Sequence, residues 1–117
     1  MAPKDMVLWG LVDNATAIRN FHLRVPSLAT INPPAAIQTF ADAVVPHDKS
    51  SPRPFFAPFA SFQYDPRLSN NVQTFSIRRE IHELSLPTSV VVLEIKSNWG
   101  HEDFTCLCRL RIHGRLL

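Results

Sequence analysis

The sequence predicts a mainly β domain, and the architecture that we expect is a β-sandwich. Ten prolines stand against three glycines among the 117 residues. Because proline is excluded from helix interiors, this composition argues against an all-helical bundle. Several short runs of β-branched and aromatic residues are separated by turn-forming residues, which is typical of sandwiches. Runs that alternate apolar and polar side chains indicate an antiparallel sheet with one face in water.

Size and charge limit the function. The chain has room for one domain, and its 45% apolar and 19% charged residues argue against disorder. Twelve basic and ten acidic residues leave a net charge of +2, too little for a protein that must neutralise many nucleic-acid phosphates. Two cysteines cannot hold together a disulfide-dense miniprotein. The apolar run at 6–12 is far shorter than the ~20 residues that cross a bilayer, and no signal-peptide cleavage site follows it.

The first half of the chain contains one clear element. Residues 6–12 are rich in apolar, β-branched and aromatic side chains and predict a buried strand, which Asp13 and Asn14 close. Residues 13–54 differ, because their apolar side chains keep no lasting period and six prolines interrupt them. We interpret 13–54 as a flexible, proline-rich insertion in the domain, with at most a short helix over 35–43.

Order is expected to resume at Phe55 with a strand in which Phe59 and Ser61 share one face, ending in a turn at 65–66. A second turn is expected at 69–71. The elements predicted after it are a strand over 72–77, a helical turn or two over 78–86, a strong strand over 90–95 and a turn over 97–100.

The last predicted strand spans 105–113 and alternates two kinds of side chain. One face is apolar and the other is mostly basic, as expected of a sheet that packs on one side and meets water on the other. The apolar face comprises Cys106, Cys108, Leu110 and Ile112, and the basic face comprises Leu107, Arg109, Arg111 and His113.

Metal and catalytic sites find little support. His101, Cys106, Cys108 and His113 lie within thirteen positions, and thiolates with imidazoles suit zinc. The spacing argues against a zinc site, because the two cysteines are expected along an extended strand and not on a knuckle; buried thiols are the better interpretation. Three scattered glycines cannot form a phosphate loop, and we expect no cofactor. Solvated roles are expected for Glu80, Glu83, Glu94, Glu102 and Asp103.

Four segments carry a resemblance. Residues 97–114 (SNWGHEDFTCLCRLRIHG) closely resemble the C-terminal signature of the SUN domain (Sad1/UNC-like) family. Residues 2–11 (APKDMVLWGL), 59–65 (FASFQYD) and 72–75 (VQTF) match further family segments in the same order. The sequence LWGLV at residues 8–12 and the proline-rich insertion that follows it are similar to those of fungal-type members. The resemblance covers 2–12 and about 55–114 and leaves the insertion unassigned.

For the fold, this resemblance implies a jelly-roll-like, galactose-binding-like β-sandwich. It also implies that residues 1–117 are the C-terminal part of such a domain. Family members carry further strands, a coiled coil and a transmembrane helix upstream, so a truncated gene model, or a fragment, is the simplest account. Any membrane attachment would then come through segments absent from this chain.

For function, the resemblance implies a non-enzymatic module of the nuclear envelope. SUN domains form homotrimers, sit at the inner nuclear membrane and bind the C-terminal tail of KASH-type proteins in the perinuclear space, by strand addition and capture of the terminal carboxylate. The carboxylate pocket uses three hydroxyls, and the matching positions here are Met1, Phe104 and Cys108. None has a hydroxyl. Since charge-assisted hydrogen bonds contribute about 1.5–3 kcal/mol each, we expect KASH-tail binding to be weak or absent.

The other motif residues are expected to hold the fold. Trp99 would fill one end of the sandwich as packing mass, and Cys106, whose family partner lies upstream, would be a free thiol. The full set is Asn98, Trp99, Gly100, Thr105, Cys106, Arg109, Arg111, His113 and Gly114. Two alternatives remain open: a carbohydrate- or metal-binding sandwich, by analogy of fold alone, and a remnant without function.

Overall fold

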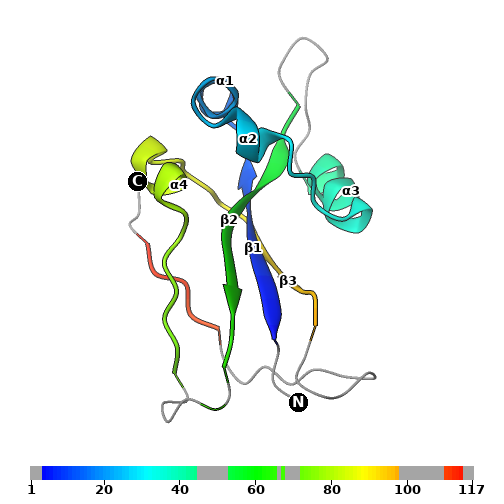
Figure 1. The fold of residues 1–117 in the computed structure, drawn as a ribbon. Coiled ribbons are helices and arrows are strands. Elements are labelled where there is room, and N and C mark those ends of the chain that lie inside the picture. The colour runs from blue at the N-terminus through cyan, green and yellow to red at the C-terminus, as the bar shows by residue number, and fades with distance from the viewer. Residues whose placement is uncertain (1–3, 45–52, 66, 68–71, 98–109, 115–117) are drawn as a thin grey trace.

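A three-stranded antiparallel sheet forms the centre of the protein (Figure 1). The computed structural model describes residues 4–44, 53–65, 67, 72–97 and 110–114. β1 (Asp5–Val12) lies between β2 (Phe55–Gln63) and β3 (Val91–Ile95), in the order β2-β1-β3. These are the strands predicted at 6–12, from Phe55 onward and at 90–95, and all three are confirmed. The sheet agrees with a mainly β fold.

β1 is buried because it lies between two strands and because helices cover both faces of the sheet. Every residue from Met6 to Val12 is buried, so this strand reads as a continuous apolar run without alternation. A bulge between Leu8 and Trp9 shifts its register with β2, so that Trp9 pairs with Pro58 and Val7 with Ser61. The bulge breaks the alternation predicted for β2 and places Phe59 and Ser61 on opposite faces.

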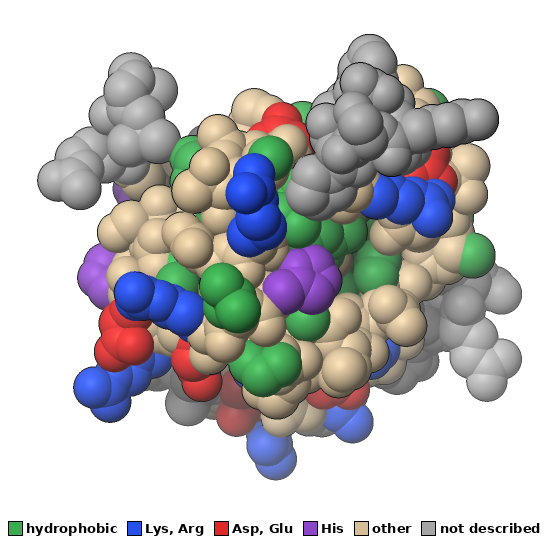
Figure 2. Space-filling model, turned by 90° about the horizontal axis from the view of Figure 1, so that it is seen from above, with side chains coloured by type: hydrophobic (Ala, Val, Ile, Leu, Met, Phe, Trp, Pro, Cys, Tyr) green, Lys and Arg blue, Asp and Glu red, His purple; other side chains and the backbone are tan. Residues whose placement is uncertain are grey.

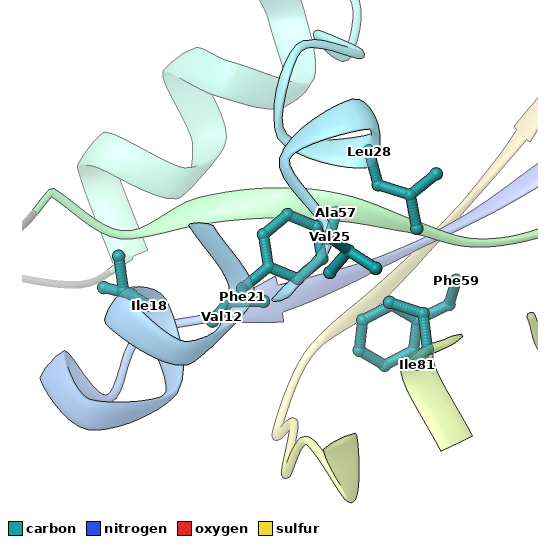
Figure 3. Packing of buried hydrophobic residues seen from close by; sticks show 8 residues of the cluster. All are labelled: Val12, Ile18, Phe21, Val25, Leu28, Ala57, Phe59 and Ile81. Atoms are coloured by element: carbon teal, nitrogen blue, oxygen red, sulfur yellow. The ribbon is translucent and has the colours of Figure 1, made fainter. Parts of the chain in front are cut away.

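One face of the sheet is covered by three helices: α1 (Ala15–Arg24), α2 (Pro26–Ala29) and α4 (Arg79–Leu84). Apolar side chains from these helices meet β1 and β2 in the cluster of Figure 3. Phe21 is fully buried at its centre and packs 5.2 Å, centroid to centroid, from the ring of Phe55. The cluster comprises Val12, Ile18, Phe21, Val25, Leu28, Ala57, Phe59 and Ile81.

The opposite face of the sheet is covered by α3 (Ala35–Val44). Val7, Trp9 and Leu11 point to this side of β1, since alternate residues of a strand face opposite ways. Ala41 of α3 and Phe56 of β2 complete the second cluster. Helices therefore cover both faces of the sheet in the described residues (Figure 1).

Residues 15–44 contain three helices, α1, α2 and α3, where the sequence predicted at most a short helix over 35–43. Asn14, expected only to close β1, is the N-cap of α1 and accepts hydrogen bonds from the backbone N–H groups of Thr16 and Ala17. Pro26 does not interrupt a helix but starts one, because the first helical position needs no N–H donor. The short helix predicted at 35–43 is confirmed as α3.

The helical turn predicted at 78–86 is confirmed as α4, but the strand predicted at 72–77 is not formed, and the described part of the strand predicted at 105–113 has no strand structure. Residues 72–78 have no strand structure, and Val72 is 74% exposed. Residues 110–113 also lack it; Leu110 and Ile112, expected on a packed face, are 45% and 52% exposed because no described strand pairs with them. Residues 105–109 and the turns at 69–71 and 98–100 lie outside the described residues.

The second sheet of a β-sandwich is not among the described residues, so the jelly-roll-like and galactose-binding-like details stay predictions. None of the helices described in Figure 1 has the length and apolar character needed to span a membrane.

Candidate functional site

The segments that carry the family resemblance meet at one end of the sheet, where β1 begins and β2 and β3 end (lower part of Figure 1). We call this the motif end of the sheet. Antiparallel pairing brings the start of β1 and the ends of β2 and β3 together, although these residues are far apart in the sequence. The motif end comprises Lys4, Asp5, Tyr64, Asp65, Gln73 and Ser97.

Ser97 and Asp5 are joined by reciprocal hydrogen bonds across 92 positions of sequence. The hydroxyl of Ser97 donates to Asp5 Oδ2 at 2.8 Å and accepts from the backbone N–H of Asp5 at 3.2 Å. The backbone N–H of Lys4 donates to the carbonyl of Ser97 at 2.7 Å. These bonds attach the first residue of the 97–114 segment to the segment at 2–11.

Asp65 and Gln73 join the other two matched segments. The backbone N–H of Asp65 donates to Gln73 Oε1 at 3.1 Å, and Gln73 Nε2 donates to the carbonyl of Asp65 at 2.6 Å. One side-chain amide thus satisfies both backbone groups of Asp65, as a neighbouring strand would. Beside this pair the rings of Phe62 and Phe75 stack, with centroids 4.4 Å apart and planes at 19°. The strand predicted at 72–77 is replaced here by side-chain contacts.

Asp65 is also the acidic group at the motif end whose pKa is shifted. The backbone N–H of Arg67 donates to its carboxylate at 2.9 Å, and the guanidinium Nε donates at 3.1 Å. Both bonds stabilise the charged form, so they hold the pKa of Asp65 below its ordinary value, the backbone bond contributing most. The carboxylate stays ionised at neutral pH.

Most of the site residues predicted from the sequence lie outside the described residues. This holds for the expected peptide-binding positions and for most of the structural motif. The residues concerned are Met1, Asn98, Trp99, Gly100, Phe104, Thr105, Cys106, Cys108 and Arg109. Arg111, His113 and Gly114 are described and are exposed. Of the zinc candidates, His101 and both cysteines lie outside as well, and in the described part no three potential ligands come together.

A cleft on the α3 side of the sheet was not expected from the sequence. It has a volume of about 370 Å³ and lies between the sheet and residues 31–34, the segment that precedes α3. On its floor the indole Nε1–H of Trp9 donates to Glu94 Oε1 at 3.0 Å. Glu94 was expected in solvent, but it is half-buried. A buried indole N–H needs an acceptor, and Glu94 supplies it from the adjacent strand β3.

Charged side chains are spread over the surface at the end of the molecule where α1 and α2 lie, which we call the helical end (Figure 1 and Figure 2). In Figure 2, which views the molecule from the helical end, basic and acidic groups are interspersed and form no continuous patch among the described residues. One ion pair of this kind joins Arg53 to Asp42. The carboxylate of Asp42 raises the pKa of Arg53 above its ordinary value, mainly through the hydrogen bond between the two side chains.

Most of the chain is similar to one family of known proteins. A sequence model for the family described as "Sad1 / UNC-like C-terminal" matches residues 11–116, and thus includes the helical segment 15–44. SUN domain-containing protein 3 of Bos taurus is 46% identical over 48 residues, which are 41% of this chain and 12% of that protein.

Two human proteins are also similar. SUN domain-containing protein 5 of Homo sapiens is 39% identical over 54 residues, 46% of this chain and 13% of that protein. SUN domain-containing protein 1 of Homo sapiens is 60% identical over 25 residues, 21% of this chain and 3% of that protein. The chain therefore matches a small part of each relative's length. No solved structure matches the chain significantly.

Proposed function

Because this chain belongs to the Sad1/UNC-like C-terminal (SUN domain) family, we propose that it is a non-enzymatic protein-interaction module of the nuclear envelope. Its partner is the C-terminal tail of a KASH-type protein, and its place is the perinuclear space beside the inner nuclear membrane. The module links the nucleus to the cytoskeleton and positions the nucleus as part of a homotrimer. In this proposal the chain is a fungal-type member of the family and corresponds to the C-terminal part of the domain.

The observation that carries this proposal is the motif end of the sheet. Four segments, separated in the sequence by up to 92 positions, are joined there by hydrogen bonds between their own side chains and backbones. These contacts join the matched segments into one folded unit, which supports a folded module over a remnant that cannot fold.

Nothing in the described part favours the alternative of a carbohydrate- or metal-binding module. A metal site needs several ligating side chains within reach of one ion, and such a group is absent from the described residues.

The affinity for the tail is expected to be low. Met1, Phe104 and Cys108 occupy the positions at which the family uses hydroxyls to bind the terminal carboxylate. Each missing donor removes a charge-assisted hydrogen bond of about 1.5–3 kcal/mol. Strand addition to the sheet, which uses backbone groups, does not depend on these side chains.

A peptide titration tests the proposal. A fluorescent KASH-type tail with a free terminal carboxylate is titrated with the purified chain, with the double variant Phe104→Tyr, Cys108→Tyr, and with the conservative control Phe104→Leu. We expect weak binding by the unmodified chain and at least about tenfold tighter binding by the double variant, since one such bond exceeds 1.4 kcal/mol. The gain should vanish with the amidated tail. Sub-micromolar binding by the unmodified chain, or no binding by the double variant, would contradict the proposal.

A further inference from the structure

The cleft on the α3 side of the sheet combines charged donors with both polar and apolar lining residues. Val7 and Trp9 form part of its lining from β1, and residues 31–34 form the opposite wall. Arg78 lies on the side of β2, whereas Glu94 and Lys96 lie on the side of β3. The cleft is on a face of the sheet and does not include the residues of the motif end.

Hydrogen bonds hold two of the charged groups in place. Arg78 donates from Nε to the carbonyl of Pro58 and from Nη2 to the hydroxyl of Ser61, both at 3.1 Å. Glu94 is held by the indole of Trp9 at 3.0 Å. Nη1 of Arg78 and the ammonium of Lys96 have no hydrogen-bond partner among the described residues, and these two donors remain for a ligand.

The walls of the cleft favour ionic contacts. Three prolines contribute to the lining, and proline has no backbone N–H, so side chains supply most of the donors. Contact with apolar groups lowers the local dielectric constant and strengthens a charge-assisted hydrogen bond. The lining prolines are Pro33, Pro34 and Pro58.

Charge and volume indicate the ligand. Arg78, Lys96 and Glu94 give the cleft a net charge of one positive unit. One carboxylate of a ligand balances this charge, whereas a dianionic phosphate would exceed it. A volume of about 370 Å³ lies at the small end of the range for ligand pockets, roughly 300–1,000 Å³. Such a volume accommodates an acidic side chain and part of its apolar neighbour.

We propose that this cleft binds an acidic side chain of an extended peptide segment, whose carboxylate pairs with Arg78 and Lys96 while an adjacent apolar side chain packs on the wall formed by residues 31–34. This second peptide site is independent of the motif end and of the terminal carboxylate of a KASH-type tail.

The test uses the full chain labelled with ¹⁵N and the indole N–H signal of Trp9 as reporter. The probe is the blocked pentapeptide acetyl-Gly-Leu-Glu-Leu-Gly-amide, and its control carries glutamine in place of glutamate. We expect the glutamate peptide to shift the Trp9 signal with saturation and the glutamine peptide to bind at least about fivefold more weakly, the effect of one partly exposed ion pair. The Trp99→Phe variant assigns the signal.

Variants separate the cleft from general charge effects. Lys96→Gln, at an exposed position, should weaken binding about fivefold, while Arg24→Gln on exposed α1 should leave it unchanged. Glu94→Gln keeps an acceptor for the indole and removes a repulsive charge, so it should tighten binding. Equal binding of both peptides, no shift at millimolar peptide, an unaffected Lys96→Gln variant, or tighter binding of inorganic phosphate would each overturn the proposal.

Discussion

Gly10 lies in the middle of β1, and its lack of a side chain makes room for an aromatic ring. A Cβ atom added at this position would lie 2.5–2.7 Å from three atoms of the Phe59 ring, closer than real Cβ atoms approach. Phe59 is itself held among the buried side chains of α2 and α4, as Figure 3 shows. The ring therefore cannot move aside at low cost.

Replacing Gly10 by alanine is expected to destabilise the fold. Overpacking of a close-packed core costs about 1–3 kcal/mol, so Gly10→Ala should lower the free energy of unfolding by about that amount in urea titrations followed by circular dichroism. The matched control is Gly114→Ala, because a Cβ there meets nothing within 4 Å. Equal stability of the two variants would show that the ring of Phe59 does not pack on Gly10.

Asp65 is expected to titrate below its ordinary range. Its pKa, lowered first by the backbone N–H of Arg67 and then by the guanidinium, should rise in Arg67→Ala but stay below the ordinary value of about 3.9, because the backbone bond remains. A carboxyl NMR titration of both proteins measures this. With a folded pKa below the unfolded one, the charged carboxylate stabilises the fold above about pH 4, and this contribution is lost as the pH falls through the folded pKa. A variant pKa at or above 3.9 would contradict the assignment.

At the scale of elements, α1 depends on its N-cap. The side-chain oxygen of Asn14 accepts hydrogen bonds from Thr16 and Ala17 at 2.9 and 3.2 Å, and Ile18 and Phe21 of this helix are buried in the core. Loss of the cap therefore affects the whole domain and not only a surface helix.

Asn14→Ala should lower the free energy of unfolding by about 1 kcal/mol, the usual cost of removing an N-cap. Asn14→Ser keeps a capping oxygen and should remain close to the unmodified chain. Thermal unfolding of the three proteins, compared at one pH, measures the difference. If serine destabilised as much as alanine, the cap would not be the cause.

The strands could be predicted from the sequence and two of the helices could not. β1 is a continuous apolar run that fits a central strand, and in β3 Leu93 and Ile95 alternate with Glu94 after a run of valines, which fits a neighbouring strand. The prolines of 13–54 indicate interruptions, although Ile18, Phe21, Val25 and Leu28, which lie in or beside α1 and α2, follow a 3–4 spacing typical of helices. That signal is present in the sequence, but a helix of four residues such as α2 acquires its structure from packing, which local spacing does not reveal.

The candidate site was predictable only in part. The resemblance named the four segments, but their meeting depends on strand order and on pairings across 92 positions. The cleft with Trp9 and Glu94 depends on a bulge and on two registers, none of which has a local signature here. Alternation also predicted a strand at 72–77, where Gln73 instead provides the hydrogen bonds from its side chain.

At the scale of the molecule, helices and sheet share their cores. Val12 and Phe59 of the sheet pack with Phe21 of α1, and Ala41 of α3 packs with Leu11 and Trp9. Neither the sheet nor the helices can bury their apolar side chains alone. We therefore expect residues 15–44 to unfold together with the sheet.

Native-state hydrogen exchange tests this expectation. The amides of Ile18 and Phe21 should open with a free energy close to that of Leu8 and Leu11, because a single cooperative unit exposes all of them at once. As an internal reference, the exposed amide of Ile112 should exchange fast. Free energies for α1 well below those for β1 would identify the helices as a separate, weaker unit.

The outer side of β2 has a consequence for solubility. β2 is a long apolar strand at the edge of the sheet, the kind of segment that recruits a strand from another molecule and begins aggregation. Here the backbone groups of Asp65, Phe59 and Pro58 are already occupied by Gln73 and Arg78. A second copy of the chain would have to displace the side chain of Gln73 and both the side chain and the backbone N–H of Arg78 before it could extend the sheet towards a fibril.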